Sequence, residues 1–434
     1  MADLDLIRRN VKKLNLDSYA IRLIRTNIEQ IRFSNNLVDL RNYWTREGIS
    51  IFLNSGKKIT EISLDNDSNI EEKIEKSYRA MLNGEESSTF NGINPEKYGS
   101  IERIEDQEKT VELDDIVNAC IEGARDGGSE RSTGLAYRTY TDDHIITPFN
   151  EHHVTYDDFN FDIRAFRGLS TGQEGVHFSS TVKDPVEIAR NAGLEAGKTA
   201  SLTVPSREFE AGNFETLLSP YVIGNIFTYC SSLFSAYSVQ MGMSYLDESL
   251  GKKVASESLT LVDSPLNREG SNFTLFDDEG TPCFNKNLIN QGVLENFVHS
   301  YSTAVTSGTK TTGNAGIISP EPLQLSMESG NKSVEDLLHS IDRGLYIKNA
   351  WYTRFQDNRN AVFSTVPRDG IFMVENGEIT GKIGGVRISD SFGKIIKNIS
   401  GVSRELKNVK FWEEVSPSIM ASVIVQDLHV TKAF

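Results

Sequence analysis

The sequence has few basic residues for its length. Its 434 residues include 45 Lys and Arg against 61 Asp and Glu, which gives a formal net charge of −16. No basic tract is longer than a pair. Proteins that grip nucleic acid need a basic face, because Lys and Arg displace the counterions of the phosphates. This composition argues against nucleic acid as the main partner.

Cysteines and long apolar runs are scarce as well. Cys120, Cys230 and Cys283 are odd in number and far apart, which favours a reduced compartment over a disulfide framework. The chain starts with acids where a signal peptide has basic residues. Residues 216–246 carry no charge, but polar residues interrupt them and no apolar run exceeds three residues. We therefore expect a cytoplasmic protein with no membrane span.

The remaining composition predicts a folded protein, since 38% of the residues are hydrophobic. Patterning predicts the α+β class with two domains: an N-terminal α/β domain over residues 1–203 and a C-terminal β-rich domain over residues 204–434. The second is expected to be built around a buried helix, which begins at Ser219-Pro220 and keeps helical spacing to Tyr237.

In the N-terminal half, strands and helices are expected to alternate in groups, with turns at Asn35-Asn36 and near Glu47-Gly48. Residues 83–109 are polar and aperiodic, which predicts a long surface connection. The expected strands are 19–25, 29–33, 37–42, 48–54, 135–141, 144–149, 162–167 and 175–180, and the expected helices are 4–14, 69–82, 113–125 and 185–198.

In the C-terminal half, glycine turns separate many strand-like segments. The expected strands are 259–262, 272–276, 294–300, 361–366, 370–375, 382–388 and 420–425, and the expected helices after the buried one are 333–343 and 392–400.

Two clusters could be taken for catalytic or metal sites. Residues 168–172 match G-x-S-x-G, but the segment that follows alternates like a strand, so a hairpin turn is the better interpretation. Glu151-His152-His153, with His144, Asp157 and Asp158 nearby, is rich in metal-binding side chains. In an extended strand His152 and His153 point to opposite faces, which disfavours one shared ion.

Two glycine-containing segments could be taken for ion sites. Residues 308–316 lack the Lys-Ser/Thr spacing of a phosphate loop, and we interpret them as a flexible, polar loop beside a groove. Residues 276–280 read Phe-Asp-Asp-Glu-Gly, which is more typical of a hairpin tip than of a cation site.

Several segments of the second half together resemble the TldD/PmbA family. The resemblance is strong over residues 215–430 and weaker before them. It is carried in order by 276–282 (FDDEGTP), 288–294 (LINQGVL), Ala304, 312–315 (TGNA), 344–346 (GLY), 374–379 (VENGEI) and 417–418 (PS). The resemblance implies an N-terminal α/β domain and a C-terminal β-rich domain, in a family that includes the two subunits of a cytoplasmic protease.

The resemblance also implies which subunit type this is. The zinc-bearing TldD type carries H-E-x-x-x-H on a helix, with two histidines for the metal and a glutamate for a bound water. Here the corresponding positions 227–232 read Phe-Thr-Tyr-Cys-Ser-Ser, no histidine lies between His177 and His299, and no cysteine follows Cys283. We therefore expect a PmbA/TldE-like subunit with no catalytic residue, metal ligand or cofactor of its own.

The implied partners are a TldD-like zinc peptidase subunit and unfolded or leader peptides. By resemblance, the substrate-binding candidates are Thr311, Thr312, Gly313, Asn314 and Gly316, although a turn fixed by glycines explains them equally well. Two alternatives stay open: a stand-alone homodimeric peptide-binding modulator, or a peptidase that uses His152, His153 and Asp157. The family's older description as a modulator of DNA gyrase does not imply DNA contact in so acidic a chain.

Overall fold

The computed structural model describes residues 4–64, 69–103, 111–270, 273–316, 319–411, 413 and 415–433. In the N-terminal half the elements are α1 (Leu4–Lys12), β1 (Ser18–Ser34), β2 (Leu37–Ser55), β3 (Lys58–Leu64), α2 (Ile70–Asn83), β4 (Glu102–Arg103), α3 (Leu113–Asp126), β5 (Arg131–Ile146), β6 (Glu151–Arg167), β7 (Ser170–Ser179) and α4 (Pro185–Ser201). All four helices expected in this half are confirmed.

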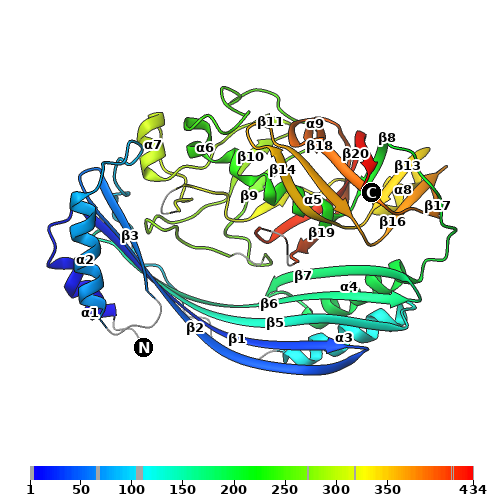
Figure 1. The fold of residues 1–434 in the computed structure, drawn as a ribbon, viewed down its shortest axis with the longest axis horizontal. Helices are drawn as coiled ribbons and strands as arrows, with labels where there is room; N and C mark the ends of the chain where they lie inside the picture. Colours follow the sequence, from blue (N-terminus) through cyan, green and yellow to red (C-terminus); the bar gives the residue numbers. More distant parts are fainter. Residues whose placement is uncertain are drawn as a thin grey trace.

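The N-terminal strands form one curved sheet in the order β3-β2-β1-β5-β6-β4, with β7 also paired to β6 (Figure 1). The predicted turn at Asn35-Asn36 is confirmed, and both residues have positive φ, which asparagine tolerates. The turn predicted near Glu47-Gly48 is wrong. Both residues lie inside β2, opposite Arg25 and Ile24, so the four short strands expected over 19–54 are two long ones.

Helices cover one face of this sheet at its two ends. Ile21 and Ile51 pack with α1 and α2, whereas Ile31 and Phe33 pack with α3 and α4. The opposite face of the sheet lies toward the C-terminal half (Figure 1). The two halves are joined there by an ion pair between Arg22 on β1 and Asp278. The predicted hairpin at 168–172 is confirmed as the β6–β7 connection, with Gly168 at φ 55° and Leu169 fully exposed.

The connection predicted over 83–109 differs from the expectation. Residues 85–101 have no helix and no strand, as expected, and many of them are exposed, but part of the segment is packed into the fold. Phe90 and Ile93 are buried against Ala20 and Phe52 of the sheet. The last part of the predicted connection, residues 104–109, lies outside the described residues.

The C-terminal half contains one large mixed sheet, in which β9, β12, β20, β8 and β13 are successive neighbours. Its elements are β8 (Gly212–Leu218), α5 (Pro220–Tyr229), η1 (Ser231–Phe234), α6 (Ala236–Gln240), β9 (Leu261–Asp263), β10 (Lys286–Asn290), β11 (Val293–Leu294), α7 (Tyr301–Ser307), β12 (Leu325–Met327), α8 (Val334–His339), β13 (Arg343–Ile347), β14 (Ala350–Asp357), β15 (Val362–Pro367), β16 (Ile371–Glu375), β17 (Glu378–Lys382), β18 (Val386–Ser391), α9 (Phe392–Lys397), β19 (Ile399–Val409) and β20 (Ser418–Lys432).

The expected buried helix is present but shorter. Every residue of α5 from Pro220 to Thr228 is buried, yet the helix ends at Tyr229 and is followed by η1 and α6. The break before α6 lies at Ser235, whose backbone is extended. The α+β class is confirmed, whereas the division at residues 203/204 stays a prediction. None of the helices among the described residues is long and apolar enough to cross a membrane.

Three segments of this half correct the sequence reading. The strand expected over 294–300 is only β11, and Ser300 instead caps α7, which patterning missed. Residues 273–276 form no strand, and 272 lies outside the described residues. The helix expected to reach residue 343 ends at His339, because Arg343 already pairs within the sheet.

Candidate functional site

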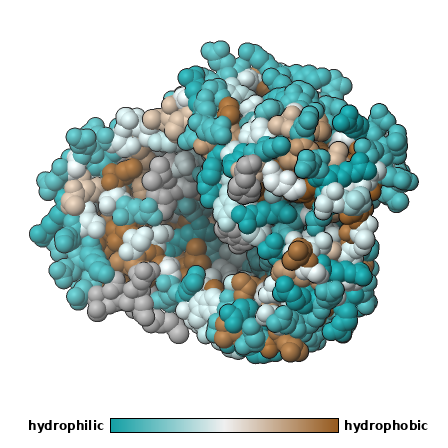
Figure 2. All heavy atoms as spheres, turned by 45° about the vertical axis from the view of Figure 1, so that its right-hand side comes forward, coloured by the Kyte–Doolittle hydropathy of each residue, from teal (hydrophilic) through white to brown (hydrophobic). Residues whose placement is uncertain are grey.

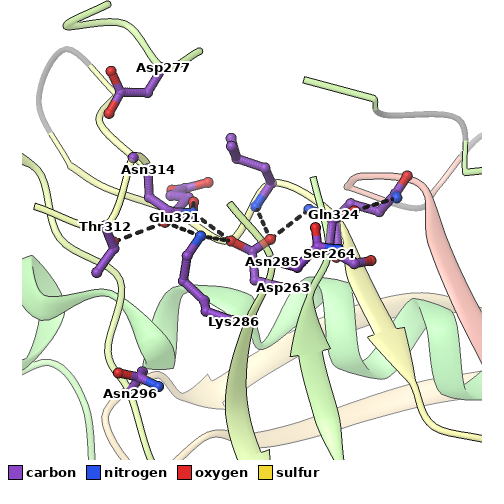
Figure 3. Close-up of polar contacts among 12 residues, drawn as sticks. Asp263, Ser264, Asp277, Asn285, Lys286, Asn296, Thr312, Asn314, Glu321 and Gln324 are labelled. Carbon is purple, nitrogen blue, oxygen red and sulfur yellow. Dashed lines mark hydrogen bonds and ion pairs between the residues drawn. The ribbon is translucent and has the colours of Figure 1, made fainter. Parts of the chain in front are cut away.

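The loop that carries the substrate-binding candidates is held by a buried polar network (Figure 3). Asn314 is fully buried at its centre. Its Oδ1 accepts hydrogen bonds from Lys286 Nζ at 2.8 Å and from Thr312 Oγ1 at 2.9 Å. Its Nδ2 donates to Asp263 Oδ2 at 2.7 Å and to the Glu321 carbonyl at 3.0 Å. The side chain therefore uses all of its hydrogen-bonding capacity.

The charges of this network come from two neighbouring strands. Asp263 on β9 and Lys286 on β10 are direct register partners, and Lys286 Nζ lies 3.0 Å from Asp263 Oδ2. The other carboxylate oxygen accepts the backbone N–H groups of residues 323 and 324, at 2.9 and 3.0 Å. Both side chains are buried. Removing an ion pair from water costs free energy unless its hydrogen-bonding groups are satisfied, and both carboxylate oxygens of Asp263 accept two hydrogen bonds each.

The remaining candidates are fixed as well. Thr312 Oγ1 accepts from the His299 N–H at 2.7 Å, and Thr311 Oγ1 donates to the His299 carbonyl at 3.1 Å. Gly313 has φ 65°, and a Cβ there would lie 2.5 Å from the Pro282 carbonyl oxygen. The predicted flexibility of this loop finds no support in these contacts. Gly316 lines a cavity between the two halves; whether the five residues bind a substrate stays a prediction.

The turn predicted at 276–280 is confirmed, but its acids are not all at an exposed tip. Asp277 is buried and accepts the N–H groups of Glu279 and Thr281 with Oδ1, at 3.0 and 2.9 Å. Its Oδ2 accepts the Ala315 N–H at 2.9 Å, which ties the turn to the candidate loop. Burial raises the pKa of Asp277 to about 7, against the opposing effect of the three amides.

The segment 227–232 at the end of α5 is packed with aromatic rings. Phe227 meets Phe392 edge-on, with ring centroids 5.0 Å apart, and Tyr229 packs on Phe355 at 4.7 Å. Cys230 is fully buried, and burial raises the pKa of its thiol. Zinc is bound by several thiolates, imidazoles or carboxylates. A single protonated thiol among aromatic rings does not fit that ion.

The histidine cluster on β6 is divided between different partners. His152 is fully buried, with Nε2 2.9 Å from the Gly280 carbonyl and Nδ1 accepting the Ile101 N–H. His153 instead contacts Asp142 at 2.9 Å, and Asp157 is paired with Arg138. The predicted separation of the two histidines is confirmed. Within the described ranges, no three His, Cys, Asp or Glu side chains converge to hold a metal ion.

Comparison with known proteins defines the class. Residues 211–432 match the family model described as the PmbA/TldA metallopeptidase C-terminal domain. The chain is 28% identical to a "Metalloprotease TldD homolog" of Buchnera aphidicola over 222 residues, 49% of this chain and 45% of that protein. It is 25% identical to "Metalloprotease PmbA" of Escherichia coli O157:H7, over 44% of this chain and 42% of that protein. The matched part spans about half the length of such curated relatives.

Two solved structures share the fold along nearly the whole chain. TldE from Thermococcus kodakarensis superposes with a TM-score of 0.81 at 21% identity, over 98% of this chain and 99% of that one. A protein of Thermotoga maritima described as a modulator of DNA gyrase gives 0.79 at 22% identity, with the same coverage. This chain belongs to the PmbA/TldD metallopeptidase family, as the sequence motifs indicated.

Sequence reasoning missed the charged residues that hold the candidate loop. Asp263 ends an apolar run and Lys286 starts another, and that position at strand ends is the only sequence signal for them. Nothing in the sequence indicates that two distant charges meet over Asn314. The sequence indicates only a turn at Glu279, although this residue is buried and lines the same cavity as Gly316.

Proposed function

We propose that this chain is the non-catalytic, PmbA/TldE-like subunit of a two-subunit metallopeptidase that degrades unfolded or leader peptides in the cytoplasm. The observation that carries the proposal is the packing of residues 227–232. Where the zinc-bearing type has its ligands, this chain has Phe227 and Tyr229 in aromatic contacts and one buried thiol. A catalytic subunit could not build a hydrolytic metal centre from these groups.

The role left for such a subunit is to stabilise the zinc-bearing partner and to form part of the wall around the peptide. Figure 2 shows a hollow between the part of the N-terminal sheet that carries α2 and the C-terminal half. The Asp263–Lys286 pair holds Asn314, in the middle of the candidate loop at 311–316. A loop that is ordered before a peptide binds can form part of the wall around that peptide with little loss of entropy.

A reconstitution experiment tests this proposal. The chain is mixed with a TldD-type subunit that carries H-E-x-x-x-H, and complex formation and cleavage of an unfolded peptide are measured. We expect a defined hetero-complex, and a higher cleavage rate than either subunit gives alone. A matched control uses the partner with its motif glutamate replaced by glutamine, which should still bind but not cleave. A chain that forms only homodimers and leaves the rate unchanged would support the stand-alone modulator instead.

A further inference from the structure

A cavity of about 200 Å³ lies where the two halves of the chain meet. Its walls come from β1 and β2, from the irregular segment after α2, and from the region where α7 begins. These parts are joined directly, because the Asn91 N–H donates to Ser302 Oγ at 2.9 Å. Figure 1 shows α7 beside the end of the sheet that carries β3.

One wall of the cavity is apolar. Ala20, Phe52, Phe90 and Ile93 are all buried there, and the rings of Phe52 and Phe90 lie 5.4 Å apart. An apolar cavity of about 150 Å³ is large enough to bind benzene. The space here is therefore sufficient for a hydrophobic amino-acid side chain together with a small polar group.

The facing wall is acidic and hydroxylated. Glu279 lines the cavity with 6% of its surface exposed, and its Oε2 accepts the Tyr301 N–H at 3.1 Å. In the part of the chain that the structure describes, no Lys or Arg pairs with Glu279. Arg22, the guanidinium of this corner, is already paired with Asp143 at 2.6 Å and with Asp278. Burial and the neighbouring Asp277 hold the pKa of Glu279 well above its usual value.

We propose that this cavity binds the N-terminal residue of a peptide, with the free α-ammonium group on Glu279 and an apolar side chain against Phe52 and Phe90. An ammonium has three N–H donors. The cavity offers it the Glu279 carboxyl group and the remaining lone pairs on the hydroxyl oxygens of Ser300 and Ser302, which already accept the N–H groups of Thr303 and Asn91. It would also stabilise the ionised form of Glu279, which burial disfavours while the cavity is empty. The peptide as the source of the ammonium rests on the proposed function above.

The test uses L-leucinamide as the probe, because it carries an α-ammonium and an apolar side chain but no carboxylate. Binding to the purified full chain is measured by calorimetry, alongside N-acetyl-leucinamide, which has no ammonium, and glycinamide, which has no apolar side chain. We expect leucinamide to bind at least about tenfold more tightly than either control, the effect of one charge-assisted hydrogen bond. Equal binding of leucinamide and its acetylated form, or no binding of leucinamide, overturns the proposal.

Two variants locate the site. Glu279→Gln removes the charge at nearly constant shape and should weaken leucinamide binding by about tenfold or more. Glu378→Gln, at an exposed position of β17, is the matched control and should leave binding unchanged. Ala20→Val projects extra carbon atoms into the cavity and should also weaken binding. Each variant is first checked by its thermal unfolding midpoint, and the three-probe comparison on the unaltered chain decides the question if a variant does not fold.

Glu279 could instead serve only to accept the backbone N–H groups of Tyr301 and Asn94. In that case Glu279→Gln and Glu378→Gln bind leucinamide equally, and the proposal is wrong. Failure here is distinct from failure of the proposed function. A chain that activates a zinc-bearing partner without binding leucinamide contradicts only the cavity assignment, whereas a chain that binds leucinamide but activates no partner contradicts only the subunit role.

Discussion

Two parts of the C-terminal half, both singled out by the family resemblance, are built in opposite ways. Residues 227–232 are packed among Phe355 and Phe392, with no charged side chain. The loop at 311–316 is instead fixed by a buried ion pair and a saturated asparagine. Aromatic packing tolerates changes of similar volume, whereas a charge network fails when one member is removed. The loop should therefore be the less tolerant part.

The largest expected effect is in the charge network. Lys286→Met leaves the Asp263 carboxylate buried without its cation and should cost about 3–5 kcal/mol of unfolding free energy. Urea unfolding of the variant and of the unaltered chain measures this loss of unfolding free energy. The double variant Asp263→Asn/Lys286→Met removes both charges and should recover part of the loss. A cost below about 1 kcal/mol for the single variant would show that the pair does not hold the loop.

The corresponding change in the apolar segment is Phe227→Ala. It empties a fully buried ring site and should cost about 3–4 kcal/mol in the same urea assay. Phe227→Leu, which keeps most of the volume, should cost less than half as much. If the leucine variant were as unstable as the alanine variant, shape alone would not explain this segment.

Within the loop, the candidates should differ from one another. Asn314→Ala leaves Lys286 and Asp263 each short of a partner and should cost about 2–3 kcal/mol. Thr311→Ala removes a hydrogen bond to the His299 carbonyl and a long one, 3.4 Å, from the Gly313 N–H, and should cost less than about 1 kcal/mol. Equal unfolding midpoints for the two variants would contradict the central position of Asn314.

The turn at 276–280, which is tied to the loop through Asp277 and the Ala315 N–H, should differ from the apolar segment in its response to pH. Asp277 has a folded-state pKa of about 7 against an ordinary value of 3.8, so the folded state holds a proton that the unfolded state has released. The unfolding free energy should therefore fall as pH rises from about 4 to about 7. Asp277→Asn should show a shallower decline than the unaltered chain, and Phe227→Leu the same decline. Parallel pH profiles for all three proteins would contradict this assignment.

The smallest expected effect concerns thiol chemistry. Cys120, Cys230 and Cys283 are all buried, and burial raises the pKa of each. The reactive thiolate is scarce in the native state, so a thiol reagent at pH 8 should modify none of them within minutes and all three after unfolding in guanidinium. Rapid modification of Cys230 in the native protein would show that the apolar segment opens.

The sequence was sufficient for the family and for much of the fold, because helical periodicity and asparagine turns are local signals. Prediction from the sequence failed where contacts distant in the chain determine the secondary structure or burial of a residue. Gly48 reads as a turn residue but is held in β2 by pairing with Ile24. Phe90 reads as part of a surface loop but is buried against Phe52. The contact of Asp263, Lys286 and Asn314 joins residues that no local pattern connects.

We propose that residues 227–232 are packed where the zinc-bearing type has its metal centre, and that this chain acts only beside a zinc-bearing subunit. Metal content and peptide cleavage of the purified chain, measured after incubation with zinc and removal of free ion, test it most directly. We predict less than about a tenth of a zinc ion per chain and no cleavage until a TldD-type partner is added. One zinc per chain together with cleavage by the chain alone would contradict the account.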